Sequence, residues 1–215
     1  RKLSAQRLEN RAEQILIDWY GQYPDVEDLP IDIEDMIEFA SESDDLDLIV
    51  DDSIDRGLPS GSGPAILGVS RWSADGKRKE LVVHGELFDG DTPQERYRCR
   101  FTLAHEYFHC IEHLPHLGQA NSPHLNRPNI FTAEYSTETK KRWYEKESKA
   151  RRLQSPSDWR EWQANYFAAC LLMPRKLISN LFKRMTNEDF VITESCEQKI
   201  IADQIARQPI QVDGT

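Results

Sequence analysis

Apolar positions in the first forty residues predict two amphipathic helices. The first helix places its apolar side chains on one face and ends near Gly21 and Pro24, which interrupt the pattern. These side chains belong to Leu8, Ala12, Ile15, Leu16 and Trp19. A second, shorter helix is predicted over 31–40. Its apolar side is made by Ile33, Met36, Ile37 and Ala40.

Three short apolar runs that follow are typical of strands. The first is LDLIV at 46–50. The other two, AILGVSRW at 65–72 and RKELVVH at 78–84, flank an Asp-Gly turn, so they predict a β-hairpin. The segment 57–64 is rich in Gly and Pro and is predicted to be a loop.

A central helix is predicted to begin at Thr92. Thr92 can cap the helix, Pro93 suits its first position, and Glu95 completes a capping box. The helix is expected to end near Leu114, because Pro115 follows. Its predicted buried stripe consists of Tyr97, Phe101, Ala104, Phe108 and Ile111.

Three more helices are predicted towards the C-terminus. One begins after a cap at 155–158 and reaches Met173. The next is expected to begin at Pro174 and carries Leu177, Ile178 and Leu181. A last helix is predicted over 196–206.

Composition is that of an ordinary soluble protein, with 215 residues, 39% hydrophobic and 30% charged. No apolar run is long enough to span a membrane, and the opening residues lack both Met and an apolar signal region, which suggests a trimmed chain. The cysteines form no CxxC pair and are interpreted as reduced thiols of a cytoplasmic protein. Among them, Cys110 is interpreted as a small buried apolar residue.

Charge is unevenly distributed around a net value of −10, and this acidity argues against direct nucleic-acid binding. Between Asp25 and Asp55 there are fourteen acidic residues and no Lys or Arg. The stretch from Glu138 to Arg160 has eight basic and four acidic residues. Both stretches can be interpreted as solvated surface. The alternative is that the acidic stretch faces a basic partner.

The predicted central helix carries an HExxH motif, HEYFH at 105–109. The spacing places His105 and His109 on one helical face, one turn apart. Two neutral imidazoles in this arrangement can hold one Zn²⁺ at roughly 2.0–2.1 Å each. Glu106 lies about 100° around the helix from His105, where it can take a proton from water at the metal.

The third zinc ligand is not supplied by the extended pattern HExxHxxGxxH. That pattern would need Gly at 112 and His at 115, where this chain has Glu112 and Pro115. His113 continues along the helix away from the motif, and His116 lies beyond the proline, so both are poorly placed for ligation.

A better third ligand is offered by Glu161, in an ExxxN motif on the helix that follows the cap at 155–158. Its carboxylate would complete a His₂Glu site that leaves the fourth position for water. Asn165 lies one turn further on the same face and can hydrogen-bond a ligand histidine.

FTLAHEYFHCIEHL and the later EWQANYFAACLLMP together resemble the ImmA/IrrE-type zinc metallopeptidases. The resemblance covers most of residues 8–114 and 155–210. It implies that His105, His109 and Glu161 are the zinc ligands and that Glu106 is the general base. The spacing between the two motifs is longer than in that family, which indicates an insertion at 115–155 that could be a lid, a recognition element or a disordered loop.

We therefore expect one α+β domain over 1–215, in which a helical body carries the HExxH helix and the second ligand helix beside a small antiparallel sheet. The leading hypothesis is an intracellular zinc endopeptidase. The resemblance implies that its substrate is a helix-turn-helix repressor or a related regulatory protein, with roles in gene control or stress response.

Two alternatives remain open at this stage. One is a zinc-binding regulatory module with little proteolysis, whose acidic part and insertion form a partner surface. The other is a helical binding protein without metal. The group that stabilises the oxyanion is also not decided among Tyr166, His113, His116 and His124.

Overall fold

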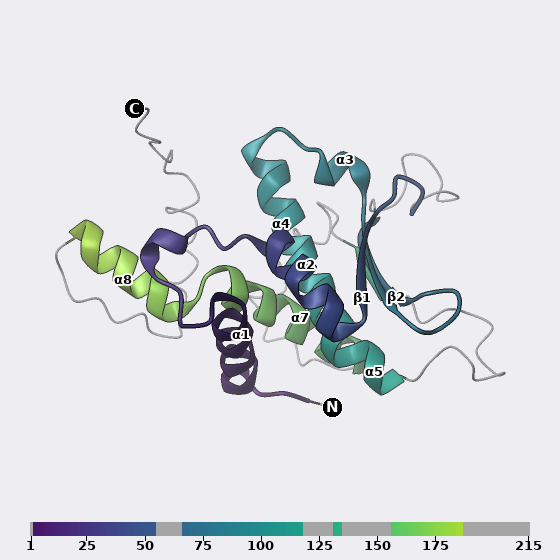
Figure 1. Ribbon diagram of the computed structural model, residues 1–215, viewed down its shortest axis with the longest axis horizontal. Helices are drawn as coiled ribbons and strands as arrows, with labels where there is room; N and C mark the ends of the chain where they lie inside the picture. The colour runs from purple at the N-terminus through teal and green to yellow at the C-terminus, as the bar shows by residue number, and fades with distance from the viewer. Residues whose placement is uncertain (1, 55–65, 118–130, 135–155, 187–215) are drawn as a thin grey trace, which may run out of the picture. The chain divides into compact units, whose positions relative to one another are not determined.

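The computed structural model describes residues 2–54, 66–117, 131–134 and 156–186, which are drawn as a ribbon in Figure 1. The chain divides into two compact units, Arg1–Pro174 and Arg175–Thr215. The first unit contains α1 (Ala5–Tyr20), η1 (Val26–Asp28), α2 (Ile33–Asp44), β1 (Leu46–Val50), β2 (Ile66–Trp72), β3 (Lys79–Val83), α3 (Gly85–Phe88), α4 (Pro93–Phe108), the π-helical turn η2 (His109–His113), α5 (Leu114–Leu117), β4 (Phe131–Glu134) and α7 (Pro156–Leu172). Among the described helices, none is long and apolar enough to cross a bilayer.

The second unit is represented by α8 (Arg175–Thr186), which begins directly after Pro174 as the sequence predicts. The predicted loop at 57–64 and the predicted last helix at 196–206 lie outside the described residues. A single domain over 1–215 stays a prediction.

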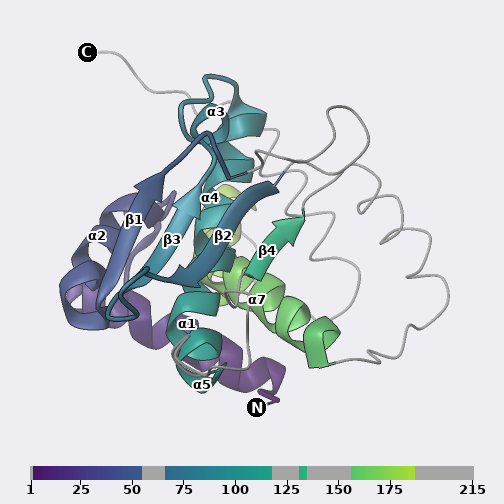
Figure 2. The ribbon, with the colours of Figure 1, turned by 90° about the vertical axis from the view of Figure 1, so that its right-hand side faces the viewer.

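Four strands form one sheet in the order β1-β3-β2-β4, and Figure 2 shows them side by side. β2 runs antiparallel to both β3 and β4, whereas β1 pairs with β3 in parallel. The α+β class is therefore confirmed, but the sheet is mixed rather than antiparallel. A hairpin pattern predicts antiparallel pairing only for two strands that follow each other in the chain. β1 pairs with β3, which is not the next strand in the chain, so the pattern does not predict the direction of that pairing.

The hairpin between β2 and β3 is confirmed. Its turn is closed by the Ser73 N–H, which donates to the Arg78 carbonyl oxygen at 2.8 Å. Gly76 lies in the left-handed region with φ 70°, which glycine adopts without a steric penalty. The turn thus fixes the register that pairs Gly68 with Val83 and Ser70 with Leu81.

β4 comes from the segment predicted to be an insertion, 115–155. It pairs with β2 at the edge of the sheet, with Thr132 opposite Val69 and Phe131 opposite Ser70. The described part of this segment therefore adds a strand to the sheet. Residues 118–130 and 135–155 lie outside the described residues.

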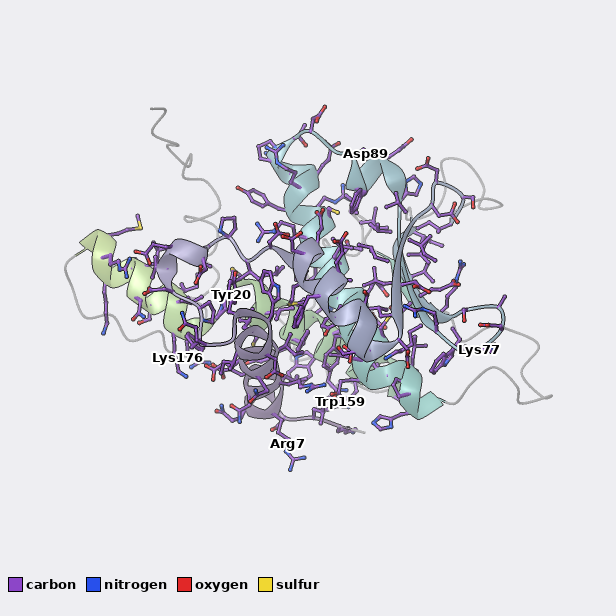
Figure 3. The ribbon with its side chains drawn as sticks, in the orientation of Figure 1. Arg7, Tyr20, Lys77, Asp89, Trp159 and Lys176 are labelled. Carbon is purple, nitrogen blue, oxygen red and sulfur yellow. The ribbon has the colours of Figure 1, made fainter. Side chains whose placement is uncertain are left out.

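The two N-terminal helices bury the faces that the sequence predicts, except that Trp19, near the end of α1, is only half-buried. In α1 these are Leu8, Ala12, Ile15 and Leu16, and in α2 they are Ile33, Met36, Ile37 and Ala40. The segment before α1 is attached to α7, because the Leu3 N–H donates to Oε1 of Gln163 at 2.8 Å. Lys2 Nζ also lies 4.5 Å from the ring centroid of Trp159, which is labelled in Figure 3.

The central helix α4 begins with the predicted capping box between Thr92 and Glu95. It does not end at Leu114: the chain continues through η2 into α5, and Pro115 lies within the first turn of α5. The predicted stripe is wrong at Tyr97, whose exposed fraction is 46%. From Thr102 to Phe108 every residue is buried, because the sheet packs on one side of α4 and α7 on another.

Candidate metal centre

Small side chains allow α4 and α7 to approach each other closely. Ala104 on α4 and both Ala164 and Ala168 on α7 are fully buried. Beside them the rings of Phe108 and Phe167 pack with centroids 4.6 Å apart. Small residues between helices let the backbones come near, so side chains from both helices can meet at one point.

His105, His109 and Glu161 meet at that point. Their ligand atoms all lie within 4.8 Å of one another, which makes a cluster compatible with a metal site. Nε2 of His105 lies 3.0 Å from Nε2 of His109. The Glu161 carboxylate lies 3.3 Å from His105 Nε2 through Oε2 and 3.6 Å from His109 Nε2 through Oε1.

These separations fit a small tetrahedral cation. Two ligands bound at 2.0–2.1 Å in tetrahedral geometry lie about 3.3 Å apart, which is close to the observed values. Two imidazole nitrogens and one carboxylate form a donor set that leaves a fourth position open. The cluster therefore has the geometry and the chemistry that the two sequence motifs predict.

The cluster is closed on the α4 side and open beside α7. The exposed fraction of His105 is 3% and that of His109 is 0%, whereas the Glu161 side chain is 35% exposed. Solvent can therefore reach the cluster past Glu161, while the two histidines are held in the protein interior.

Charge within the cluster is mutually stabilised. Burial tends to raise the pKa of Glu161, but hydrogen bonds with His105 and His109 outweigh burial and hold the pKa of this carboxyl far below its usual range. For His105, burial tends to lower the pKa, but the contact with Glu161 raises it above the ordinary value. A metal ion binds the neutral imidazole, so a cation held here would compete with the proton that the raised pKa keeps on His105.

The outer nitrogens of both histidines also have contacts. Nδ1 of His105 lies 3.1 Å from Oδ1 of Asn165, which is the contact predicted from the ExxxN motif. The Nδ1–H group of His105 donates to the amide oxygen, which leaves the lone pair of a neutral imidazole on Nε2, facing the cluster. Asn165 therefore selects the tautomer of His105 that a metal needs.

His113 takes the corresponding place behind His109. The two Nδ1 atoms lie 2.9 Å apart within η2, and such π-helical turns are frequent at functional sites. Burial, followed by the charges of His109 and Arg160, lowers the pKa of His113 to about 3. A neutral His113 can accept the Nδ1 proton of His109, so His113 contacts a ligand histidine instead of joining the cluster.

Glu106 lies fully buried on the same helix and contacts strand β2. Its Oε2 is hydrogen-bonded by the Ser70 hydroxyl, which also lies 2.9 Å from the Glu106 carbonyl oxygen. Its other oxygen, Oε1, is buried without a hydrogen-bond partner among the described residues. Burial raises the pKa of Glu106 above its ordinary value, and the charges of His105 and His109 oppose that rise.

The other side chains that the sequence analysis considered, from His116, His124, Tyr166 and Cys110, are not among the three residues of the cluster. His116 is exposed on α5, outside the cluster, and His124 lies outside the described residues. The Tyr166 ring packs on Trp162 with centroids 5.4 Å apart. Cys110 is a buried free thiol, as predicted.

Sequence reasoning missed Ser70. No motif includes this residue. The available signal was the position of a serine within the otherwise apolar run ILGVS, which the structure shows to be a largely buried strand.

Residues 141–201 match the family profile of the IrrE N-terminal-like domain, Peptidase_M78. For this segment the match confirms the resemblance to the ImmA/IrrE family, whose members are metallopeptidases. Glu161 and Asn165 lie within the matched residues, and the HExxH motif precedes them. No curated protein matched the chain in the search.

Proposed function

We propose that the chain is a zinc-dependent endopeptidase of the HExxH…Glu type. The observation that carries this proposal is the convergence of His105, His109 and Glu161 from two helices, with the buried carboxyl of Glu106 on the same helix as the histidines. The match to the IrrE N-terminal-like domain supports the same chemistry.

Each residue has a distinct part in this proposal. His105 and His109 would hold zinc through imidazole nitrogens, and Glu161 would hold it through its carboxylate. The chemistry that zinc would supply when bound is that of a Lewis acid, which lowers the pKa of water to about 7. Glu106 accepts the proton of the attacking water and delivers it to the leaving nitrogen of the peptide bond. Oε1 suits this part because it has no partner among the described residues.

We further propose a substrate class and a cellular location. The substrate would be a DNA-binding repressor of the helix-turn-helix type, cut in the cytoplasm during a stress or regulatory response. Two features support this choice: the resemblance to the ImmA/IrrE family, and the acidic residues between Asp25 and Asp52, which suit the basic face of a DNA-binding protein.

The peptidase proposal is tested on purified protein loaded with one equivalent of zinc. A proteome-derived peptide library is incubated with this protein, and new peptide ends are identified by mass spectrometry. We expect discrete cleavages that disappear with a chelator and return when zinc is added back. Zinc-loaded protein that leaves both the library and a co-expressed repressor from a neighbouring gene intact would favour the regulatory zinc module instead.

A further inference from the structure

Strand β2 presents a buried hydroxyl to the proposed general base. Ser70 is fully buried, and its Oγ lies 2.9 Å from the carbonyl oxygen of Glu106 and also within hydrogen-bond distance of Oε2. Ser70 belongs to neither of the two sequence motifs. The contact therefore connects strand β2 to Glu106, the proposed general base on α4.

The close approach of β2 to α4 depends on Gly68. A Cβ at this position would lie 2.6 Å from Cγ2 of Thr102 and 2.9 Å from Cγ of Glu106, so a side chain would push the strand away. Gly68 and Ser70 are two residues apart in the register that pairs β2 with β3. Both face α4, because the Cβ position of Gly68 and the Ser70 hydroxyl each lie against Glu106. The missing side chain at Gly68 is what allows the Ser70 hydroxyl to reach Glu106.

The contact restricts a side chain that would otherwise have several rotamers. A glutamate has three rotatable bonds, and a hydrogen bond at Oε2 fixes the carboxyl group while Oε1 stays without a partner among the described residues. The Ser70 hydroxyl donates its proton, so Oε2 is the oxygen that this contact holds and Oε1 is the oxygen that it leaves available.

We propose that Ser70 is a positioning residue that holds Oε2 of Glu106 and so keeps Oε1 as the oxygen that accepts the proton, with Gly68 providing the space. This inference rests on the proposed peptidase function. Strand β2 would then orient the general base, whereas α4 and α7 carry the metal ligands.

The test compares three variants with the wild-type protein. Ser70→Ala removes the hydroxyl with little change of volume, and Ser70→Thr keeps the hydroxyl. Val69→Ala is the matched control, because Val69 is buried on the same strand and points to the opposite face. For each protein we would measure zinc content, melting temperature, and kcat and KM on a fluorescence-quenched peptide chosen from those cleaved in the library.

We expect Ser70→Ala to lower kcat about 10- to 100-fold with KM within about twofold, zinc near one per chain and nearly unchanged melting. Ser70→Thr should recover most of kcat, and Val69→Ala should keep it. A crystal structure of Ser70→Ala should show the Glu106 carboxyl in a new or mixed conformation. This structural readout still decides the matter if the threonine variant melts early.

Two results would overturn the proposal. One is a Ser70→Ala protein with wild-type kcat and an unmoved Glu106 side chain. The other is a loss of zinc or a large drop in melting temperature, because the hydroxyl would then serve the fold. A wild-type protein that binds zinc but cleaves no peptide would count against the peptidase function alone, since the Glu106 conformation in Ser70→Ala tests the contact without turnover.

Discussion

The candidate metal centre, formed by His105, His109 and Glu161, and the acidic segment, residues 25–52, differ in how their charges are arranged. In the centre the ionisable groups are few and each contacts another: Glu161 bridges His105 and His109 at 3.3 and 3.6 Å. In the acidic segment the charges are many and most lie at the surface. Its exposed acidic residues are Asp25, Glu27, Asp32, Asp35, Glu38, Asp45 and Asp52.

This difference predicts how each region responds to substitution. Coulomb interactions strengthen several-fold when solvent is excluded, and buried groups left without partners are costly. Exposed charges are screened by water and salt, and a single one contributes little. One substitution should therefore disable the centre, whereas the acidic segment should respond only to several changes at once.

The largest effect is expected from Glu106→Gln. The amide is nearly isosteric but cannot accept a proton, so peptide cleavage should fall about 10²- to 10⁴-fold while zinc stays bound. Initial rates on a cleaved library peptide, with zinc measured by elemental analysis, would check this. Glu112→Gln is the matched control, because Glu112 lies on η2 and pairs with Arg11 at 3.4 Å instead. Full activity in Glu106→Gln would remove Glu106 from the mechanism.

Glu161→Ala should mainly affect metal binding. The substitution removes one of three ligands and leaves two buried histidines facing each other, so we expect zinc affinity to fall more than about 100-fold. Competition with a chromogenic chelator measures this change. His116→Ala, at an exposed position on α5, should retain wild-type affinity. The ligand assignment is wrong if His116→Ala releases zinc and Glu161→Ala keeps it.

A smaller effect is expected one contact further from the metal. Asn165→Ala and His113→Ala each remove the partner of one ligand histidine, at 3.1 and 2.9 Å respectively. Such partners orient the imidazole and set its tautomer, so zinc affinity should fall about 10- to 100-fold in each variant. The same chelator competition applies. If either variant lost as much affinity as Glu161→Ala, that residue would have to be regarded as a ligand.

Local patterns were enough to predict that His105, His109 and Glu161 come together. The HExxH spacing determines how two imidazoles sit on a helix, and the capping box at Thr92 marks where that helix begins. The prediction of Glu161 needed further evidence, because an ExxxN string is common in proteins. That evidence was the capped helix that carries the string and the family resemblance. The contact between α4 and α7 is made through the buried alanines Ala104, Ala164 and Ala168. The sequence does not show that these alanines face each other.

Contacts between distant strands and helices were not predictable in this way. The parallel pairing of β1 with β3 and the addition of β4 to β2 join segments that no turn connects. The π-helical turn at His109–His113 is too short to leave a periodic mark in the sequence. The exposure of Tyr97 and the contact of Ser70 with Glu106 likewise depend on where the sheet meets α4.

The smallest effect is expected in the acidic segment, and only for a protein substrate. Asp44 and Asp47 contact Tyr107 and Arg78, so they are poor choices for neutralisation. The informative triple variant is Asp35→Asn, Glu38→Gln and Asp45→Asn, because these side chains are exposed. Asp45 has φ 50°, a conformation that asparagine tolerates.

If the segment attracts a basic repressor, the triple variant should cleave that repressor about two- to tenfold more slowly at low salt, because opposite fields speed encounter. The difference should shrink as salt shortens the screening length to about 8 Å. A short neutral peptide should be cleaved at the wild-type rate. The control triple variant, Glu86→Gln with Asp89→Asn and Asp91→Asn, removes the same charge from another exposed region. Equal slowing by both triples would indicate a net-charge effect, and no slowing by either would leave the acidic segment as a solvated surface.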